Sequence, residues 1–375
     1  MSMLALNIGG YTTAQVLAAL RGTLGKRQID FRFELLDKNG TIKKTLTNVT
    51  GGGIKHDAEA EIKRSGQLTI REDGSIIYLS DRIKVWFRLR MPDGVWIEWP
   101  KGVFLLTTPV QGIDSSSVIT RAIDVYDSTI VLKDDKVASR YYVAAGAKYT
   151  DAIVELLTGT AGIWSWNVTT SLAVLPVAKE WDPGTEKYVI ISDLMKAINY
   201  NSIWFDGSGV AQVTPYVDPN DRTADFDYST DGNSVTLPDA KQTLDLFGQP
   251  NSWVFYVSNP DRAALRVTRT NTSALSPTST VSRGRTITAM VPIDDAVDAF
   301  VLGQIADQKL VEASMVYEEI SFNSALMPHH TNLDIYTFAY TGLLTSGKYA
   351  EYSWEMPLAP GAVMTHVARK AVDLV

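Results

Sequence analysis

The sequence predicts a mainly β protein with α+β insertions. Runs in which apolar and polar residues alternate occur on both sides of a segment with helical periodicity, and glycine-containing turns separate the runs. The chain has 375 residues, of which 45% are hydrophobic and 21% charged. A chain of this length and composition can form about two to four domains with substantial cores.

A short helix is expected near the N-terminus, from about Thr13 to Leu24. Thr12 and Gln15 have the spacing of a capping box, in which a hydroxyl and an amide side chain satisfy the first backbone groups of a helix. Val16, Leu17 and Leu20 follow at helical spacing and would form its apolar face.

The first β region is expected over residues 28–130. Its clearest strand runs from Ile83 to Leu89, with Ile83, Val85, Phe87 and Leu89 on one face and charged residues on the other. Turns at 92–94 and 114–117 separate further strands at 95–99, 103–107 and 118–126. Antiparallel strands with tight turns fit a small barrel or sandwich.

Residues 131–216 are expected to form an α+β domain. A helix is predicted from Tyr149 to Leu157, with Asp151 near its start and Gly159 after its end. Thr185 can cap a second helix. The sequence Asp206-Gly207-Ser208-Gly209 between two short apolar runs predicts a hairpin.

The remaining chain returns to β patterns with one helical insertion. We expect a loop at 218–239, strands at 252–258 and 265–270, a mobile loop at 273–285, a helix at 294–314, and strands at 333–338 and 351–356. The resulting domains are 1–27 as an N-terminal helical segment, 28–130, 131–216, 217–272 together with 325–375, and 273–324 as a loop and helical insertion. Two β regions of similar size suggest an ancient duplication.

Composition excludes several classes of chemistry. The chain has no cysteine, which excludes disulfides, thiolate metal sites and cysteine nucleophiles. The formal net charge is −7, which is unfavourable for binding a phosphate backbone. Neither a secretory signal nor an apolar run long enough for a membrane helix is found.

The basic row on the strand at 83–89 consists of Arg82, Lys84, Arg88 and Arg90, with Trp86 among them. It fits either a face for nucleic acid or anionic glycans, or the solvated or subunit-facing side of a sheet. The net negative charge of the chain favours the second interpretation, in which the basic side chains also keep the edge of the sheet from pairing with strands of other molecules.

Other candidate sites have weaker patterns. Asp225, Asp227 and Asp231-Gly232 resemble a calcium loop but lack its closing bidentate Glu. His329-His330 could bind a metal or act as an acid–base pair, but neighbours on a strand point to opposite faces, so a structural turn is expected. Glu318-Glu319 is interpreted as a solvated face rather than a glycosidase pair.

No catalytic motif is present. The sequence has no Gly-x-Ser-x-Gly elbow, P-loop or dinucleotide fingerprint, and only four histidines. Nine tryptophans and sixteen tyrosines could form a sugar platform or anchor protein interfaces. We therefore expect no catalytic residue, no cofactor site and no metal site, and we expect that the chain is not an enzyme.

Several segments resemble the hub family of phage tails, which includes siphophage tail hubs, the N-terminal hub region of tail-associated lysins and the baseplate hubs of contractile tails. The resembling segments are 81–84 and 93–109; 126–127 with 132–136; 181–185 with Leu194, 197–200, 204–206 and 215–216; and 354–358 with 361–364 and 368–370. Each motif is mostly strand and turn chemistry. Their order and spacing, over roughly residues 28–370, carry the resemblance.

The resemblance implies two tube-forming β-barrel domains with two peripheral domains, assembled as a homotrimer around a channel. Such a ring lies beneath the hexameric distal tail protein, narrows the lumen, and contacts the tape measure protein until DNA ejection. Other tail-tip or receptor-binding proteins would be neighbours, and DNA would pass without specific binding. The protein would reside in the virion tail tip after assembly in the host cytoplasm. Because the sequence ends soon after Lys370, any lytic activity is expected on another protein.

Two alternatives remain at this stage. A glycan-binding, receptor-binding tail-tip protein would bind purified cell-wall polysaccharide. A hydrolase with an unrecognised site would give bands on a peptidoglycan zymogram.

Overall fold

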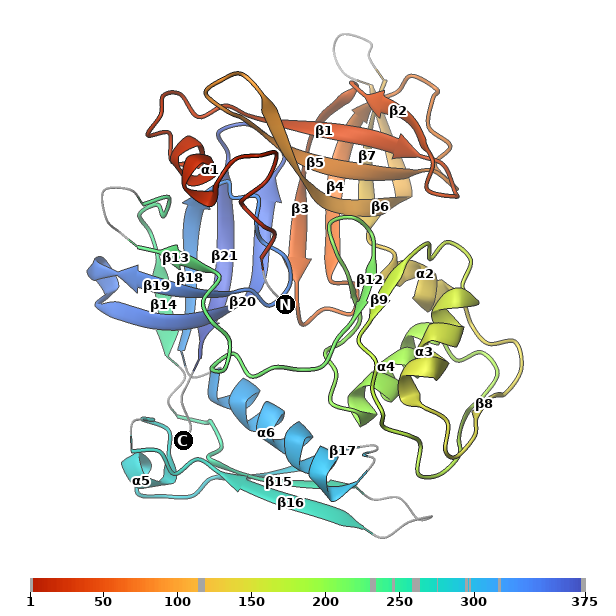
Figure 1. Ribbon diagram of the computed structural model, residues 1–375, viewed down its shortest axis with the longest axis vertical. Coiled ribbons are helices and arrows are strands. Elements are labelled where there is room, and N and C mark those ends of the chain that lie inside the picture. Colours follow the sequence, from red (N-terminus) through yellow and green to blue (C-terminus); the bar gives the residue numbers. More distant parts are fainter. Residues whose placement is uncertain are drawn as a thin grey trace.

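The computed structural model confirms a mainly β protein (Figure 1). It describes residues 3–371 except 114–118, 230–233, 245–246, 258–263, 275, 294–295, 297 and 316–317. Its largest element is a 13-stranded sheet, which contains two units of β structure. Among the described residues, no helix is both long and apolar enough to span a membrane.

The first β unit is antiparallel and carries the pattern expected from the sequence. Its strands are β1 (Ile29–Leu36), β2 (Ile42–Leu46), β3 (Val49–Asp57), β4 (Arg64–Arg71), β5 (Arg82–Arg90), β6 (Trp96–Ile113) and β7 (Ile119–Tyr126). On β5, Ile83, Val85, Phe87 and Leu89 are all buried while the residues between them are partly accessible. The sequence prediction of two strands at 95–99 and 103–107 was incomplete, because both belong to the single long strand β6. The predicted turn at 114–117 lies outside the described residues.

The second β unit repeats the strand order of the first. Its strands are β13 (Phe226–Tyr228), β14 (Lys241–Leu244), β18 (Glu318–Ala325), β19 (Ile335–Tyr340), β20 (Thr345–Pro357) and β21 (Val363–Lys370). They pair in the order β14-β18-β21-β20-β19-β13, and the first unit pairs in the order β3-β4-β7-β6-β5-β1. Taken in chain order, six strands of the first unit have counterparts in the second, and β2, which pairs with β1 at the end of the sheet, has none. Only the last pairing differs, since β13 is parallel to β19 whereas β1 is antiparallel to β5.

The two units share one sheet and one core. Residues 53–57 of β3 pair with residues 353–357 of β20, so the sheet is continuous from β14 at one end to β2 at the other. A single apolar cluster contains Phe87 and Trp99 of the first unit together with Trp354 and Met356 of the second. Within the described residues, neither unit closes into a barrel by itself.

Two smaller regions, which we call the first and second arm, lie outside the large sheet. The first arm follows β7 and contains α2 (Thr129–Asp134), β8 (Tyr141–Val143), α3 (Tyr149–Thr158), β9 (Trp166–Val168), β10 (Lys179–Trp181), α4 (Lys187–Ala197), β11 (Trp204–Phe205) and β12 (Ala211–Val213). It has an apolar core of its own. The predicted helix at 149–157 and the predicted hairpin are both present, as α3 and the β11–β12 pair. The second helix begins after Glu186 rather than at Thr185.

The second arm lies between β14 and β18 in the chain, and it also has its own core. It contains β15 (Ser252–Val257), β16 (Leu265–Thr270), α5 (Thr280–Arg283), β17 (Thr288–Ile293) and α6 (Ala299–Met315). The sequence analysis grouped the strands at 252–258 and 265–270 with the second β region. In the structure they form a separate sheet beneath α6, in which β15 pairs with β16 on one side and with β17 on the other (Figure 1). The expected mobile loop at 273–285 contains α5, and the expected loop at 218–239 contains β13.

The N-terminal helix α1 (Thr13–Leu20) forms with the predicted capping box. The side chain of Gln15 accepts the backbone N–H of Thr12, and the Thr12 hydroxyl accepts the N–H of Gln15. The helix is shorter than predicted. It ends before Gly22, whose positive φ of 71° is unfavourable for continuing a helix.

The close pairing of β3 and β4 generates a prediction about Gly66. A Cβ on Gly66 would lie 2.2 Å from the carbonyl oxygen of Gly53, whereas a Cβ on Gly51 would meet no atom within 4 Å. We expect Gly66→Ala to lower the free energy of unfolding by about 2 kcal/mol, because the strands must move apart. Gly51→Ala, the control on the neighbouring strand, should change it by less than about 0.5 kcal/mol. Equal denaturation midpoints for the two variants would contradict the observed register.

Candidate functional site

The structure concentrates buried polar groups where the two β units meet. The centre of this junction is the loop from Leu326 to Asp334, which connects β18 to β19 and is buried apart from Leu333. A buried loop must satisfy its backbone polar groups within the protein. Here the donors come from distant parts of the chain: Leu4 N–H donates to the carbonyl of His329, and Trp354 Nε1 donates to the carbonyl of Thr331.

Lys101 of β6 is the main contact from the first unit to this loop. Its side chain is completely buried, and Nζ donates to the carbonyl oxygens of Pro328 (2.5 Å) and His330 (3.1 Å). Burial and the nearby Arg64 lower the pKa of Lys101 to about 7, although Asp334 and Glu351 oppose this change. The ammonium group therefore connects the two units through charge-assisted hydrogen bonds in a dry environment.

Arg64 of β4 adds a second buried cation to the junction. Its guanidinium donates to the carbonyl of Lys101 (3.1 Å) and lies 5.6 Å from the centre of the Trp354 ring. The backbone N–H of Arg64 donates to the buried carboxylate of Asp127 (3.0 Å), which joins the start of the first arm to β4. The junction thus links both units and the first arm.

On the other side of the loop, His330 lies beside Glu351 of β20 and His366 of β21. Each imidazole Nδ1 lies 2.5 Å from one oxygen of the Glu351 carboxylate. Burial disfavours the charged forms of His330 and Glu351. The acidic Glu351 and Asp334 nevertheless raise the pKa of His330 to about 9, and the two histidines lower the pKa of Glu351 to about 2. Burial lowers the pKa of His366. The three groups form one electrostatic unit.

From the sequence, His329-His330 was expected to be a structural turn, because neighbours on a strand would not converge on one ion. The pair does lie in a turn, but the turn is buried and His330 converges with two other potential ligands. The strand argument did not apply, because these residues are in a loop between β18 and β19. His329 stacks beside Phe226 and does not join the cluster.

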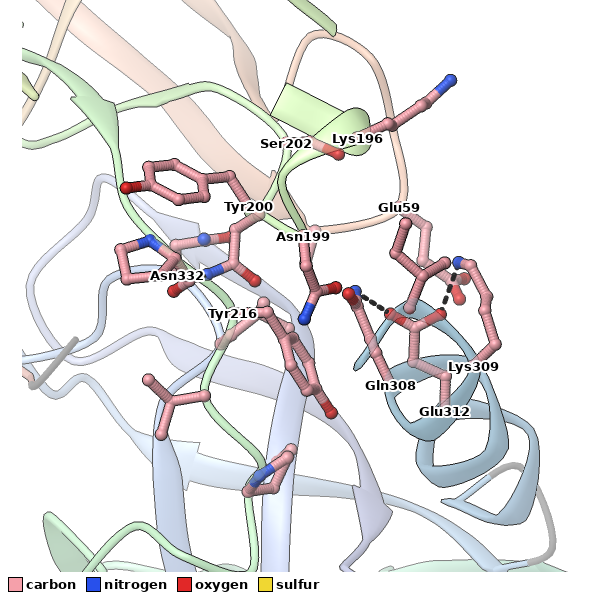
Figure 2. Close-up of a pocket in the computed structure, with 18 of the residues that line it drawn as sticks. Glu59, Lys196, Asn199, Tyr200, Ser202, Tyr216, Gln308, Lys309, Glu312 and Asn332 are labelled. Carbon is pink, nitrogen blue, oxygen red and sulfur yellow. Dashed lines mark hydrogen bonds and ion pairs between the residues drawn. The ribbon is translucent and has the colours of Figure 1, made fainter. Parts of the chain in front are cut away.

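A pocket of about 740 Å³ lies between the two arms and the second β unit (Figure 2). The end of α4, the segment around Tyr216, and α6 supply much of its wall. Several of its charged groups are paired within the chain: Glu312 accepts from Gln308 and Lys309, both at 2.7 Å, and Arg369 pairs with Glu59. Paired charges of this kind hold the walls together, and they do not form a nucleophile–base arrangement.

The basic row on β5 is largely neutralised. Arg88 pairs with Asp30 and Glu98, and Lys84 is half-buried over the ring of Trp86. Arg82 donates to Ser128 Oγ and the carbonyl of Gly162, and it is buried against the first arm of its own chain. The expectation of a solvated or subunit-facing row was therefore wrong for Arg82. Only Arg90 is exposed.

The acidic candidates also have structural partners. Asp225 pairs with Arg222 and accepts from the N–H of Ile335, and Asp227 accepts from Thr337. Asp231 and Gly232 lie outside the described residues. Glu318 was expected on a solvated face, but it is buried and accepts from Lys370 (2.8 Å). Its neighbour Glu319 pairs with Arg369.

The sequence analysis missed Lys101, Arg64, Glu351 and His366. Two local signals were available: Lys101 interrupts a strand that is otherwise largely apolar, and His366 alternates with the apolar Met364 and Ala368 on β21. Neither signal identifies a partner. The partners of Lys101, for example, lie more than 200 residues away in the sequence.

Comparisons with solved structures reveal a shared fold. A tail protein from Neisseria meningitidis MC58 superposes with a TM-score of 0.65 at 11% identity, covering 92% of this chain and 98% of that chain. The 43 kDa tail protein of prophage MuSo2 from Shewanella oneidensis gives 0.62 at 11% identity, covering 91% and 98%. Prophage tail protein gp18 from Listeria monocytogenes EGD-e gives 0.58 at 11% identity, covering 90% and 94%.

No family model matches the sequence, and no curated protein matches it either. The similarity is therefore one of fold, and it extends over nearly the whole of each tail protein. The mainly β fold that the resemblance to tail hubs implied is confirmed, while closed barrels are not observed among the described residues: the chain has the fold of these tail proteins.

The junction generates a second prediction. Lys101→Met keeps the length of the side chain but removes both donors to the loop carbonyls, so it should lower the free energy of unfolding by about 3 kcal/mol. Lys55→Met on β3 is the matched control, because Lys55 is half-exposed and its ion pair with Asp57 is a surface pair. That variant should change stability by less than about 0.5 kcal/mol. Denaturant unfolding followed by tryptophan fluorescence measures both. A Lys101→Met protein as stable as the wild type would show that the loop does not need its cation.

Proposed function

We propose that this chain is a structural protein of a phage tail and forms the trimeric hub at the tail tip. The observation that carries the proposal is the fold shared with two tail proteins, one of them from a prophage, over 98% of their own chains. Fold alone does not determine function. The proposal therefore also rests on the internal repeat, which gives the chain a geometry suited to a change of symmetry.

The repeat supports a ring in which three subunits present six similar units. Both β units have the same strand order, and they are fused through the β3–β20 pairing. A trimer that meets a six-fold tube needs each contact twice per chain, since otherwise half of the contacts on the tube would be left exposed. In this arrangement the β units surround a channel and the two arms lie outside.

The partners follow from that position. The ring would lie beneath the hexameric distal tail protein, engage the tape measure protein before ejection, and contact other tail-tip or receptor-binding proteins. The strands β2 and β14 lie at the two ends of the shared sheet. Within the described residues, each of them pairs with a single neighbouring strand. Leu79, near the β2 end, is fully exposed, as expected for a surface that another protein covers. The site of action would be the tail tip of the virion, after assembly in the host cytoplasm.

The channel wall would be neutral or acidic. Each chain carries a formal charge of −7, so a trimer carries 3 × −7 = −21. Because affinity for DNA rises with each phosphate that a protein neutralises, a basic collar would slow ejection.

A structural role also agrees with the arrangement of aromatic and acidic side chains. A glycan-binding platform gathers exposed aromatic rings, but all nine tryptophans are buried or half-buried, and the exposed Tyr142, Phe247 and Phe300 belong to different segments of the chain. Glu318 and Glu319 each have a basic partner and face different neighbours. We therefore propose a hub without enzymatic activity rather than a receptor-binding protein or a hydrolase.

The stoichiometry of the hub is a third prediction. Native mass spectrometry of the chain copurified with its distal tail protein should give three copies of a 41.2 kDa chain for each hexamer. The reason is that each chain offers two equivalent units to two neighbouring positions of the hexamer. A complex with six copies, or with one, would contradict the trimeric hub.

A further inference from the structure

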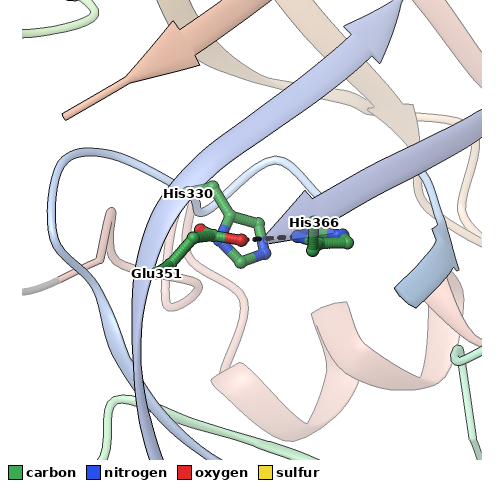
Figure 3. Close-up of side chains that lie close together, drawn as sticks. All are labelled: His330, Glu351 and His366. Atoms are coloured by element: carbon green, nitrogen blue, oxygen red, sulfur yellow. Dashed lines mark hydrogen bonds and ion pairs between the residues drawn. The ribbon is translucent and has the colours of Figure 1, made fainter. Parts of the chain in front are cut away.

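The cluster in Figure 3 is assembled by three separate elements of the second β unit. Glu351 on β20 is paired with Ala368 of β21, and His366 lies two residues from Ala368, so both side chains are on one face of the sheet. The register shift between Glu351 and Ser353 is a β-bulge, and bulges commonly redirect side chains. The buried loop then brings His330 over the same face.

The three side chains converge on one point. One ligand atom from each lies within 4.8 Å of the others. His330 Nδ1 and Glu351 Oε2 are only 2.5 Å apart, yet the pair is not aligned as a hydrogen bond, and both atoms are buried without a hydrogen-bond partner in the described structure. Buried polar atoms without an aligned hydrogen bond call for a partner, and a metal ion held by both groups is one species that would serve.

The outer nitrogens of both imidazoles are held by hydroxyl groups. Tyr228 Oη lies 2.6 Å from His330 Nε2, and Ser324 Oγ lies 2.8 Å from His366 Nε2. These contacts fix the orientation of both rings and leave each Nδ1 directed at Glu351. Metal-binding histidines characteristically have such a partner on the nitrogen that does not bind the metal.

A second carboxylate lies close by, and each of its oxygens already accepts a hydrogen bond from Thr331. Asp334 Oδ2 lies 3.4 Å from His330 Nδ1 and is completely buried. Two imidazole nitrogens with one or two carboxylates are a ligand set that favours zinc and similar transition metals over calcium or magnesium, which prefer oxygen ligands.

We propose that His330, Glu351 and His366 bind one divalent transition metal ion of the zinc type, with Asp334 as the fourth ligand. The site is structural, because all of its groups are buried and none faces the pocket. A metal there would tie the buried loop to β20 and β21, and would thus stabilise the junction that Lys101 approaches from the other unit. The inference is independent of the proposed function.

The competing arrangement has the same groups sharing protons, with His330 charged and no metal. Metal content separates the two. The untagged full chain, equilibrated with excess Zn²⁺ and passed through a desalting column, should retain about one zinc per chain by elemental mass spectrometry. Addition of a strong chelator should then lower the unfolding temperature by at least about 5 °C. Retention of less than about 0.1 zinc per chain would overturn the proposal.

Variants assign the metal to these residues. Glu351→Gln and His366→Gln should lose the bound zinc while the far-ultraviolet circular dichroism remains that of a β protein. His329→Gln is the matched control, since His329 is equally buried in the same loop but does not join the cluster. It should retain the metal. Loss of zinc from His329→Gln alone, or full retention in a folded Glu351→Gln protein, would refute the assignment.

A measurement on the wild-type chain decides the matter even where the cluster variants do not fold. Co²⁺ in a four-coordinate site of nitrogen and oxygen ligands gives intense visible absorption, whereas weakly bound surface Co²⁺ does not. We expect this absorption to saturate at about one Co²⁺ per chain and to be displaced by Zn²⁺. No such absorption, or absorption that rises without saturation, would contradict the proposed site.

Discussion

The pairing of β3 with β20 determines most of the architecture. It fuses two units with the same strand order into one sheet and brings the loop between β18 and β19 against β6 of the other unit. Once the loop is buried, its backbone carbonyls need donors, because an unsatisfied buried carbonyl costs about 1–3 kcal/mol. Lys101, Trp354 and the N-terminal segment supply those donors.

A buried cation is a costly way to satisfy carbonyl groups, and its environment shows how the cost is offset. Lys101 donates two hydrogen bonds and lies 5.5 Å from the centre of the Trp354 ring, where a cation–π contact is favourable. Asp334 and Glu351 provide compensating negative charge. An apolar residue could fill the same volume but could not fix the position of the loop. The polar junction therefore specifies one arrangement of the two units, as buried polar groups do in some other proteins.

Elements with a complete local periodic pattern could be predicted from the sequence. Sites formed by residues that are far apart in the sequence could not. The strand Ile83–Leu89, the helix α3 and the β11–β12 hairpin each carry a complete local pattern and were predicted correctly. In contrast, β13 has three residues within an acidic segment, too few to show a period. The cluster of His330, Glu351 and His366 depends on a loop, a bulge and a strand pairing that only the tertiary structure brings together. The resemblance to tail hubs implied a mainly β fold correctly, because it used the order of many weak motifs, whereas local periodicity uses one segment at a time. It also implied closed barrels, which are not observed among the described residues.

The central claim is that a duplicated β unit lets a trimer match a six-fold tail. A cryo-electron microscopy map of the intact tail tip tests it most directly. The account predicts a three-fold ring in which the two β units of each chain alternate around a channel without a collar of lysine and arginine, while both arms lie outside. A ring without three-fold symmetry, or one in which only a single β unit per chain faces the channel, would contradict the account.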